Sequence, residues 1–209
     1  MKVGIVEKPG ILKIAVRAMP KITNPDDVLV QVKRVGICGS AMHIYHGKNP
    51  FATYPRVWGH ECVGEGIEAG EGADVSVGDH VVAEPITYCG ECYACRQGRG
   101  NICSSVQVSG VHVDGGCQEY IVLPNKQLHK IPSDIAWEDA VLIEPFTIGA
   151  QSRLRGKVQA GDLELIYGSG TICLAALQFA KFYGSTVIST DIGEEKLSFA
   201  SSTGEGYTI

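Results

Sequence analysis

Residues 35–61 contain side chains whose types and spacing suit a metal site. Cys38 supplies a thiol, His43 and His60 supply imidazoles, and Glu61 supplies a carboxylate. Zinc accepts sulfur, nitrogen and oxygen ligands with little geometric preference. Glycines beside Cys38 and before His60 allow the backbone to turn tightly around such a site. The stretch therefore predicts half of the ligand set of a catalytic zinc ion.

Each of these residues also has an ordinary structural explanation. Cys38 alone fits a small buried hydrophobic residue. His60 fits a hydrogen-bonded core histidine, and His43 fits a surface side chain on a short helix. Because His60 stands beside Glu61 in a glycine-containing turn, we favour a metal ligand at His60.

Four cysteines form a second group of possible ligands. Their spacing is C-x2-C-x2-C-x7-C, and they are Cys89, Cys92, Cys95 and Cys103. Four thiolates held this close repel one another, so a bound cation compensates, and zinc is the usual one in a tetrahedral structural site. The alternatives are four free thiols and an iron–sulfur cluster, although the ferredoxin pattern has a different spacing before its last cysteine. We predict a structural zinc lobe over residues 86–106 that does no chemistry.

Composition and charge exclude several classes of partner. The chain has 209 residues, of which 44% are hydrophobic and 20% charged, as in an ordinary globular protein. Its net charge of -5 argues against nucleic acid, which requires a basic face, and no apolar run is long enough to predict a membrane span. The amino terminus lacks signal-peptide features, so we expect a cytoplasmic protein. In that reducing compartment, clustered cysteines indicate metal ligands rather than disulfides.

The first part of the chain has the pattern of short strands. Alternating apolar and polar residues are separated by turns rich in glycine and proline, which predicts a many-stranded, mostly antiparallel β domain with the metal residues in its loops. The expected strands are residues 3–6, 11–16, 28–33, 57–68, 78–83 and 118–123.

From residue 136 the pattern changes to alternating helices and strands. We expect helices over residues 136–148, 171–183 and 194–201, and strands over residues 163–167 and 186–190. This order opens a doubly wound α/β domain. We predict domains at residues 1–149 and 150–209. Because each βαβ unit takes roughly 30 residues, we expect the chain to stop within the second domain.

A glycine-rich turn follows the strand predicted over residues 163–167. Gly168 and Gly170 match the first two glycines of a dinucleotide-binding fingerprint, and Cys173 replaces the third. Asp191 follows the next predicted strand, where an acid bonds the ribose hydroxyls of NAD and disfavours the phosphate of NADP. The pattern therefore predicts NAD as the cofactor.

Several motifs, in this order, resemble the zinc-dependent medium-chain alcohol dehydrogenases. They are Gly36-Ile37-Cys38-Gly39-Ser40, Gly59-His60-Glu61-Cys62-Val63-Gly64, Gly78-Asp79-His80-Val81-Val82, the four-cysteine lobe, Gly115-Gly116-Cys117-Gln118-Glu119-Tyr120, Ile143-Glu144-Pro145 and Gly168-Ser169-Gly170. Residues 144–146 resemble the polyol, sugar-acid and threonine dehydrogenase branch, and residues 110–116 are similar to galactonate-type dehydrogenases. The resemblance covers the whole chain. It implies a GroES-like catalytic domain followed by an incomplete Rossmann domain.

The resemblance also implies a ligand set for the catalytic zinc. Cys38, His60 and Glu144 correspond to the three ligands, and Glu61 is able to join or replace one of them. A carboxylate such as Glu144 at an apolar helix end is costly without a partner. The family usually has an aspartate that orients the zinc histidine, but this chain has Ala41 there.

A proton relay is implied by the same resemblance. Ser40 would accept the proton of the substrate hydroxyl, and His43 would pass it to solvent. Such a relay requires a hydroxyl and a group that titrates near neutral pH.

These observations predict a zinc-dependent oxidoreductase that transfers hydride from a secondary alcohol to NAD. We expect one catalytic zinc, one structural zinc, and a small-molecule polyol or sugar acid as substrate. We expect a homo-oligomer for a full-length form. One alternative is a truncated, inactive zinc-binding remnant of such an enzyme. Another is a redox or metal-binding module based on the four cysteines.

Overall fold

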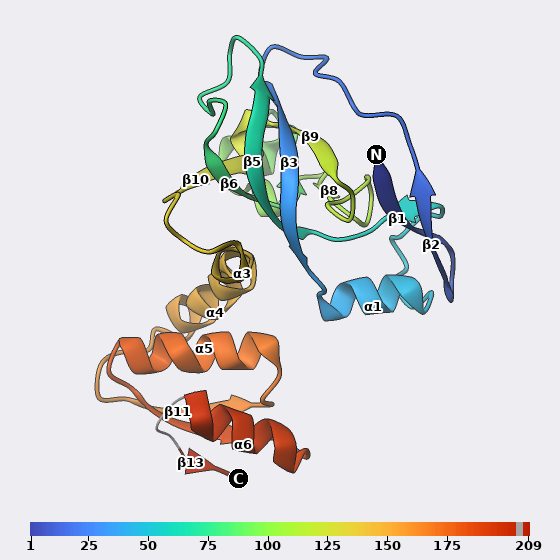
Figure 1. The fold of residues 1–209 in the computed structure, drawn as a ribbon. Coiled ribbons are helices and arrows are strands. Elements are labelled where there is room, and N and C mark those ends of the chain that lie inside the picture. Colours follow the sequence, from blue (N-terminus) through green and yellow to red (C-terminus); the bar gives the residue numbers. More distant parts are fainter. Residues whose placement is uncertain (204–206) are drawn as a thin grey trace. The chain divides into compact units, whose positions relative to one another are not determined.

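The protein consists of two compact units, Met1–Leu142 and Ile143–Ile209. The structure, a computed structural model, describes residues 1–203 and 207–209 (Figure 1). The domain boundary predicted at residues 149 and 150 falls inside a helix of the second unit. In the described part of the chain, no helix has the length and apolar character needed to cross a membrane.

The first unit is built mainly from antiparallel strands, as the sequence predicted. Its strands are β1 (Lys2–Lys8), β2 (Ile11–Val16), β3 (Asp27–Gly36), β4 (Arg56–Val57), β5 (Glu61–Ala69), β6 (His80–Ala83), β7 (Ile86–Thr87), β8 (Gln107–Val108), β9 (Tyr120–Pro124) and β10 (Leu128–Ile131). They form a five-stranded sheet of order β10-β6-β5-β3-β9, a three-stranded sheet of order β2-β1-β4, and the pair β7-β8. All of these strand pairs are antiparallel.

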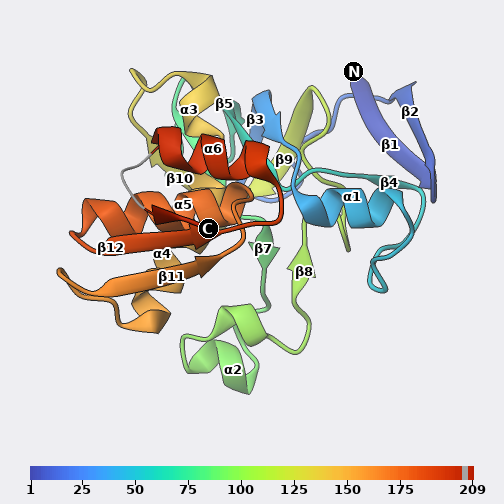
Figure 2. The same ribbon diagram turned by 90° about the horizontal axis from the view of Figure 1, so that it is seen from below.

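The first unit also contains short helical segments. They are α1 (Gly39–Tyr45), α2 (Tyr93–Arg96), α3 (Trp137–Ala140) and the 3-10 turns η1 (Gly100–Ile102) and η2 (Asn125–Gln127). Figure 2 shows that α2 belongs to a lobe that extends from β7 and β8. The lobe therefore contains the residues of the predicted structural zinc site.

The core of the first unit follows from the alternation that predicted its strands. Val28 and Val30 of β3, Val81 of β6, and Ile121 and Leu123 of β9 are buried on one face of the five-stranded sheet. Successive side chains of a strand point to opposite faces, so residues two apart share a face. The sheet thus rigidly holds the ends of β3 and β5, where the candidate metal ligands lie.

The single strand predicted over residues 57–68 is wrong, because the chain changes sheets there. Val57 of β4 pairs with Ile5 of β1, whereas β5 begins at Glu61 and pairs with β3 and β6. Between the two strands, Gly59 has a φ of 90°, a conformation that glycine adopts without a steric penalty. The turn places His60 directly before β5.

The second unit alternates strands and helices around a parallel sheet. Its elements are α4 (Ile143–Gly156), β11 (Leu163–Tyr167), α5 (Thr171–Phe182), β12 (Thr186–Thr190), α6 (Glu194–Thr203) and β13 (Tyr207–Thr208), with strand order β11-β12-β13. Leu177, Ala180, Val187 and Ala200 form its buried core. The predicted combination of an antiparallel β domain with the opening of a Rossmann domain is confirmed.

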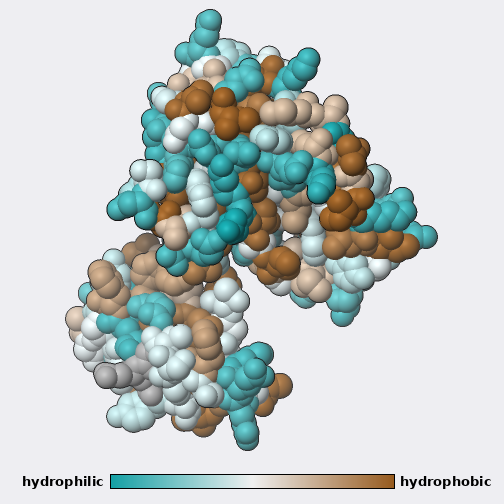
Figure 3. Space-filling model, in the orientation of Figure 1, coloured by the Kyte–Doolittle hydropathy of each residue, from teal (hydrophilic) through white to brown (hydrophobic). Residues whose placement is uncertain are grey.

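Apolar side chains also reach the surface of both units. Ile14 and Val16 of β2 are 73% and 82% exposed, and Leu163 and Leu165 of β11 are 67% and 58% exposed. Figure 3 shows hydrophobic atoms on the surface. Both β2 and β11 are edge strands, and edge strands with apolar side chains are sites at which other strands can pair.

The helix predicted over residues 136–148 is two helices. The structure has α3 at Trp137–Ala140 and α4 at Ile143–Gly156. Proline in a helix interior clashes with the carbonyl four residues earlier, which for Pro145 is the carbonyl of Val141. A helix that starts at Ile143 avoids this clash, because Pro145 then lies in the first turn.

Packing around the buried strand glycines generates a stability prediction. A Cβ on Gly64 of β5 would lie 2.2 Å from the backbone oxygen of Gln31, whereas a Cβ on Gly4 of β1 would make contacts no shorter than 3.5 Å. We expect Gly64→Ala to destabilise the first unit by about 2 kcal/mol through overpacking, and Gly4→Ala to cost much less. Both tryptophans, Trp58 and Trp137, lie in the first unit, so the urea midpoint of their fluorescence measures this difference. Equal midpoints for the two variants would contradict the prediction.

Candidate metal centres

Three predicted ligands come together in the first unit. One donor atom each of Cys38, His60 and Glu61 lies within 4.8 Å of the other two. Cys38 and His60 are partly exposed, and Glu61 is 7% exposed. A thiol, an imidazole and a carboxylate suit zinc in particular, so the chemistry of this donor set fits the predicted metal.

Backbone geometry explains why these residues meet. β3 ends at Gly36, which pairs with Glu61, the first residue of β5. A Cβ on Gly36 would lie 2.1 Å from Oε2 of Glu61, so a larger residue would require the Glu61 side chain to shift. Two residues later, Cys38 takes the extended conformation at the N-cap of α1. Sequence reasoning missed the role of Gly36, although its place two residues before Cys38 was the available signal.

His60 has one ring nitrogen without a fixed partner. Its Nδ1 atom is buried and makes no hydrogen bond within the residues that the structure describes. A metal-binding histidine usually donates its second nitrogen to a carboxylate, carbonyl or water. Ala41, which stands where the resemblance leads one to expect an aspartate, is 2% exposed and packs beside Val6 and Trp58. Ala41 therefore supplies no hydrogen bond that could orient His60.

The two relay residues lie on α1. Ser40 is in its first turn, and its hydroxyl oxygen is buried with no hydrogen-bond partner among the described residues. His43 lies almost one turn further along and is exposed. A buried hydroxyl without a protein partner is suited to bind an oxygen of a ligand or water, whereas an exposed imidazole can exchange protons with solvent.

Glu144 belongs to the second unit. It is the second residue of α4, and it makes at least one interaction. Within the first unit the grouped donor atoms are those of Cys38, His60 and Glu61, and the third-ligand role that the resemblance implies for Glu144 stays a prediction.

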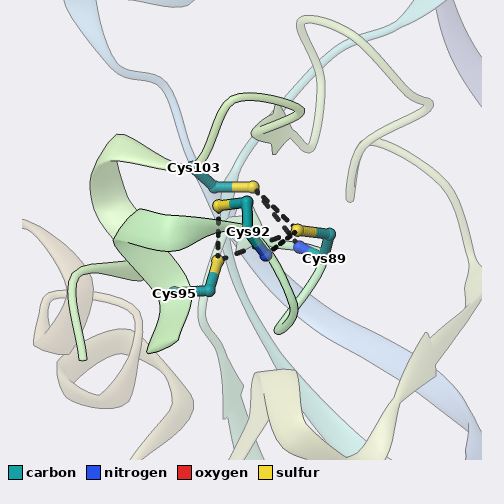
Figure 4. A group of neighbouring side chains, drawn as sticks. All are labelled: Cys89, Cys92, Cys95 and Cys103. Carbon is teal, nitrogen blue, oxygen red and sulfur yellow. Dashed lines mark hydrogen bonds between the residues drawn. The ribbon is translucent and has the colours of Figure 1, made fainter. Parts of the chain in front are cut away.

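The four cysteines of the lobe also form one group. Figure 4 shows their sulfur atoms facing a common centre, and all four lie within 4.8 Å of one another. The Sγ atoms of Cys89 and Cys95 are 3.9 Å apart, those of Cys92 and Cys95 are 3.4 Å apart, and those of Cys89 and Cys103 are 3.5 Å apart. A tetrahedron with zinc–sulfur bonds of about 2.3 Å has sulfur–sulfur edges of about 3.8 Å. The lobe therefore fits a tetrahedral ion.

Hydrogen bonds from backbone N–H groups lower the pKa of two of these thiols. Hydrogen bonds from the backbone at Cys95 and Ser104 lower the pKa of Cys92 to about 6. The backbone N–H of Cys89 and the groups of Ser105 lower the pKa of Cys103 to about 7. Zinc binds the thiolate form, so these groups reduce the free energy needed to deprotonate Cys92 and Cys103, whereas burial raises the pKa of Cys95 to about 12.

In the second unit, Asp191 is hydrogen-bonded to the glycine-rich turn of the dinucleotide-binding fingerprint. Gly168 has a φ of 99°, and Gly170 is the N-cap of α5. Asp191, directly after β12, accepts hydrogen bonds from the backbone N–H groups of Ser169 at 2.8 Å and Gly193 at 2.9 Å. The N–H of Ser169, followed by that of Gly193, lowers the pKa of Asp191. The carboxylate is thus charged and fixed beside the turn.

A pocket adjoins this turn. Its volume is about 510 Å³, and it is lined by residues that include Ser169, Gly170, Thr171 and Lys196. In the described structure, no heavy atom of another part of the chain lies within 4 Å of the position of a Cβ on Gly170. The N-terminus of a helix with open space in front of it suits a phosphate, so this part of the unit fits a dinucleotide.

Comparison with known proteins identifies the family. Residues 24–133 match the family described as "Alcohol dehydrogenase GroES-like domain". This match covers more than half of the chain. The chain therefore belongs to the alcohol dehydrogenase family that carries this GroES-like domain, and the resemblance seen in its motifs is confirmed.

Three similar proteins illustrate the relationship. A crystal structure of the alcohol dehydrogenase rspB from E. coli CFT073 with NADH is 43% identical, has a TM-score of 0.93, and is matched over 100% of this chain and 62% of that chain. Sorbitol dehydrogenase of Bacillus subtilis (strain 168) is 38% identical, with coverage of 100% and 61%. L-galactonate-5-dehydrogenase of Escherichia coli (strain K12) is 39% identical, with coverage of 91% and 56%. The chain spans about 60% of the length of the curated relatives it matches.

The lowered thiol pKa in the lobe generates a prediction about reactivity. After zinc is removed by a chelator, Cys92 should react rapidly with iodoacetamide at neutral pH, because its pKa of about 6 leaves it as a thiolate. The rate should fall as the pH decreases through about 6, and bound zinc should prevent the reaction. Peptide mass spectrometry measures the modification. Buried Cys62, whose pKa burial raises to about 12, is the unreactive internal control. A Cys92 that reacts no faster than Cys62 would contradict the account.

Proposed function

We propose that this chain belongs to a zinc-dependent oxidoreductase that transfers hydride from a secondary alcohol of a polyol or sugar acid to NAD. The observation that carries the proposal is the convergence of Cys38, His60 and Glu61 in one donor group beside Ser40. Similarity to sorbitol dehydrogenase and to L-galactonate-5-dehydrogenase supports the substrate class.

In this proposal Cys38, His60 and Glu61 hold the catalytic zinc, and Glu144 is an alternative carboxylate ligand. Zinc bound there supplies Lewis-acid chemistry, which lowers the pKa of an alcohol. Glu61 is buried, and its carboxylate lies within 4.8 Å of the other two donors. The ligand set leaves room for a substrate oxygen, as catalytic zinc sites do.

The remaining roles fall to Ser40, His43 and the fingerprint. The buried hydroxyl of Ser40 would accept the proton of the substrate alcohol and release its own proton towards His43. His43 is exposed on the same helix and exchanges that proton with solvent. In the second unit, the N-terminus of α5 orients the phosphates of NAD, and Asp191 bonds the adenosine ribose. NAD bound there would supply the hydride acceptor.

The second zinc belongs to the four cysteines of the lobe. All four positions of that tetrahedron are filled by protein sulfur, which is typical of a structural site rather than a catalytic one. We assign it the role of holding α2 and the segments on either side of it.

A substitution at the first ligand tests the proposed site. Cys38→Ser should reduce the zinc content from about two ions per chain to about one, because only the four-cysteine site remains, and it should abolish any NADH formation from polyols and sugar acids. Elemental analysis gives the zinc content, and absorbance at the NADH band gives turnover. Cys173→Ser, in the second unit, is the control and should keep both ions.

The outcomes separate the proposal from its alternatives. Two zinc ions and NADH formation in the parent, both affected by Cys38→Ser, support it. Two zinc ions without turnover on any polyol or sugar acid would favour a zinc-binding protein that is not itself an enzyme. Iron with visible absorbance would indicate a redox module instead.

A further inference from the structure

The turn that carries His60 is bonded along its length to a distant segment of the chain. The backbone N–H groups of Gly115, Gly116 and Cys117 donate to the carbonyl oxygens of Val57 at 2.7 Å, Gly59 at 2.7 Å and Trp58 at 2.9 Å. A Cβ on Gly115 would lie 2.0 Å from the oxygen of Gly59. The two backbones are therefore in direct contact, and residues 115–117 determine the path of residues 57–59.

Asp114, which precedes this segment, adds a side-chain connection. Its Oδ1 accepts a hydrogen bond from the backbone N–H of Val57 at 3.0 Å and lies 3.3 Å from Nη1 of Arg56. Its Oδ2 accepts from Nη1 of Arg17 at 2.6 Å. One carboxylate thus joins the end of β2, strand β4 and the segment that follows Asp114.

These contacts matter because they hold the backbone from which the imidazole of His60 projects. That backbone is held three residues earlier, at Val57, by Asp114, and at residues 57–59 by the N–H groups of residues 115–117. Glu61 follows His60 directly, so the same contact affects two of the three donors.

We propose that Asp114 is a positioning residue for the metal-binding group Cys38, His60 and Glu61. The inference rests on the proposed function, because it assumes that this group binds zinc. Asp114 acts through the backbone of residues 57–60 and does not touch the substrate. The contact with the N–H of Val57 is the decisive one, since partly exposed ion pairs such as those with Arg17 and Arg56 contribute little by themselves.

Two conservative substitutions separate the hydrogen bond from the charge. Asp114→Asn retains an oxygen that can accept from the N–H of Val57 but removes the negative charge. Asp114→Glu retains the charge but moves the oxygens by one methylene. If Asp114 works by holding the backbone, Asp114→Glu should weaken the site and Asp114→Asn should largely preserve it. If only the charge of Asp114 matters, Asp114→Asn should weaken the site and Asp114→Glu should largely preserve it.

Cobalt(II) serves as the probe, because its visible spectrum reports the geometry of each site. We expect Asp114→Glu to weaken cobalt binding at the Cys38 site about 10-fold, as is typical when a residue that orients a ligand is changed, and to shift its absorption bands. Asp114→Asn should remain close to the parent. Binding at the four-cysteine site should not change in either variant.

Asp79 provides a matched control within the same unit. It also accepts from a backbone N–H, that of Ser76 at 2.8 Å, and pairs with Lys130 at 2.8 Å. Asp79→Glu should change the unfolding midpoint without changing cobalt affinity. A purely structural role for Asp114 would make Asp114→Glu behave in the same way, and this result would overturn the inference.

Cys38→Ser distinguishes a failure of this inference from a failure of the proposed function. If Cys38→Ser removes one of two cobalt sites while Asp114→Glu changes neither affinity nor spectrum, the positioning role is wrong and the metal site stands. If Cys38→Ser leaves cobalt binding unchanged, the proposed metal site itself is wrong.

Discussion

The candidate site depends on the pairing of Gly36, at the end of β3, with Glu61, at the start of β5. A Cβ on residue 36 would lie 2.1 Å from Oε2 of Glu61, so the carboxylate would have to shift to make room for it. Because β3 and β5 pair at this end, the thiol that follows β3 and the imidazole and carboxylate at the start of β5 meet within 4.8 Å. On the other side of the turn, a Cβ on Gly115 would lie 2.0 Å from the backbone oxygen of Gly59. At residue 115 glycine is therefore required for space, because the obstacle is backbone.

The two candidate zinc sites differ in how the fold brings their donor atoms together. The lobe takes all four donors from residues 89–103, and its backbone N–H groups favour the thiolate form of Cys92 and Cys103. The other site takes its donors from the segment after β3 and from the turn and first residue of β5, two strands that pair with each other, and it depends on the five-stranded sheet for its geometry. A site assembled locally suits a structural ion. A site with three protein donors suits one that exchanges a ligand with substrate.

Sequence patterns predicted the local features well. Alternation identified the core strands, and the spacing of the four cysteines identified their group, because both depend on residues that are near in sequence. Two features depended on distant contacts and were not predictable from the pattern: the chain changes sheets at Gly59, and Asp114 reaches back to Val57. The interruption of the helix before Pro145 did have a local signal, since proline disfavours a helix interior, but the apolar residues around it predicted one continuous helix.

X-ray absorption at the zinc edge of the purified protein would test the central claim most directly. If Cys38, His60 and Glu61 bind one ion and the four cysteines bind another, the average zinc should have about 2.5 sulfur neighbours at about 2.3 Å, with nitrogen and oxygen neighbours at about 2.0 to 2.2 Å. A spectrum with about four sulfur neighbours per zinc and no nitrogen or oxygen shell would show that only the lobe binds zinc. That result would contradict the account of the catalytic site.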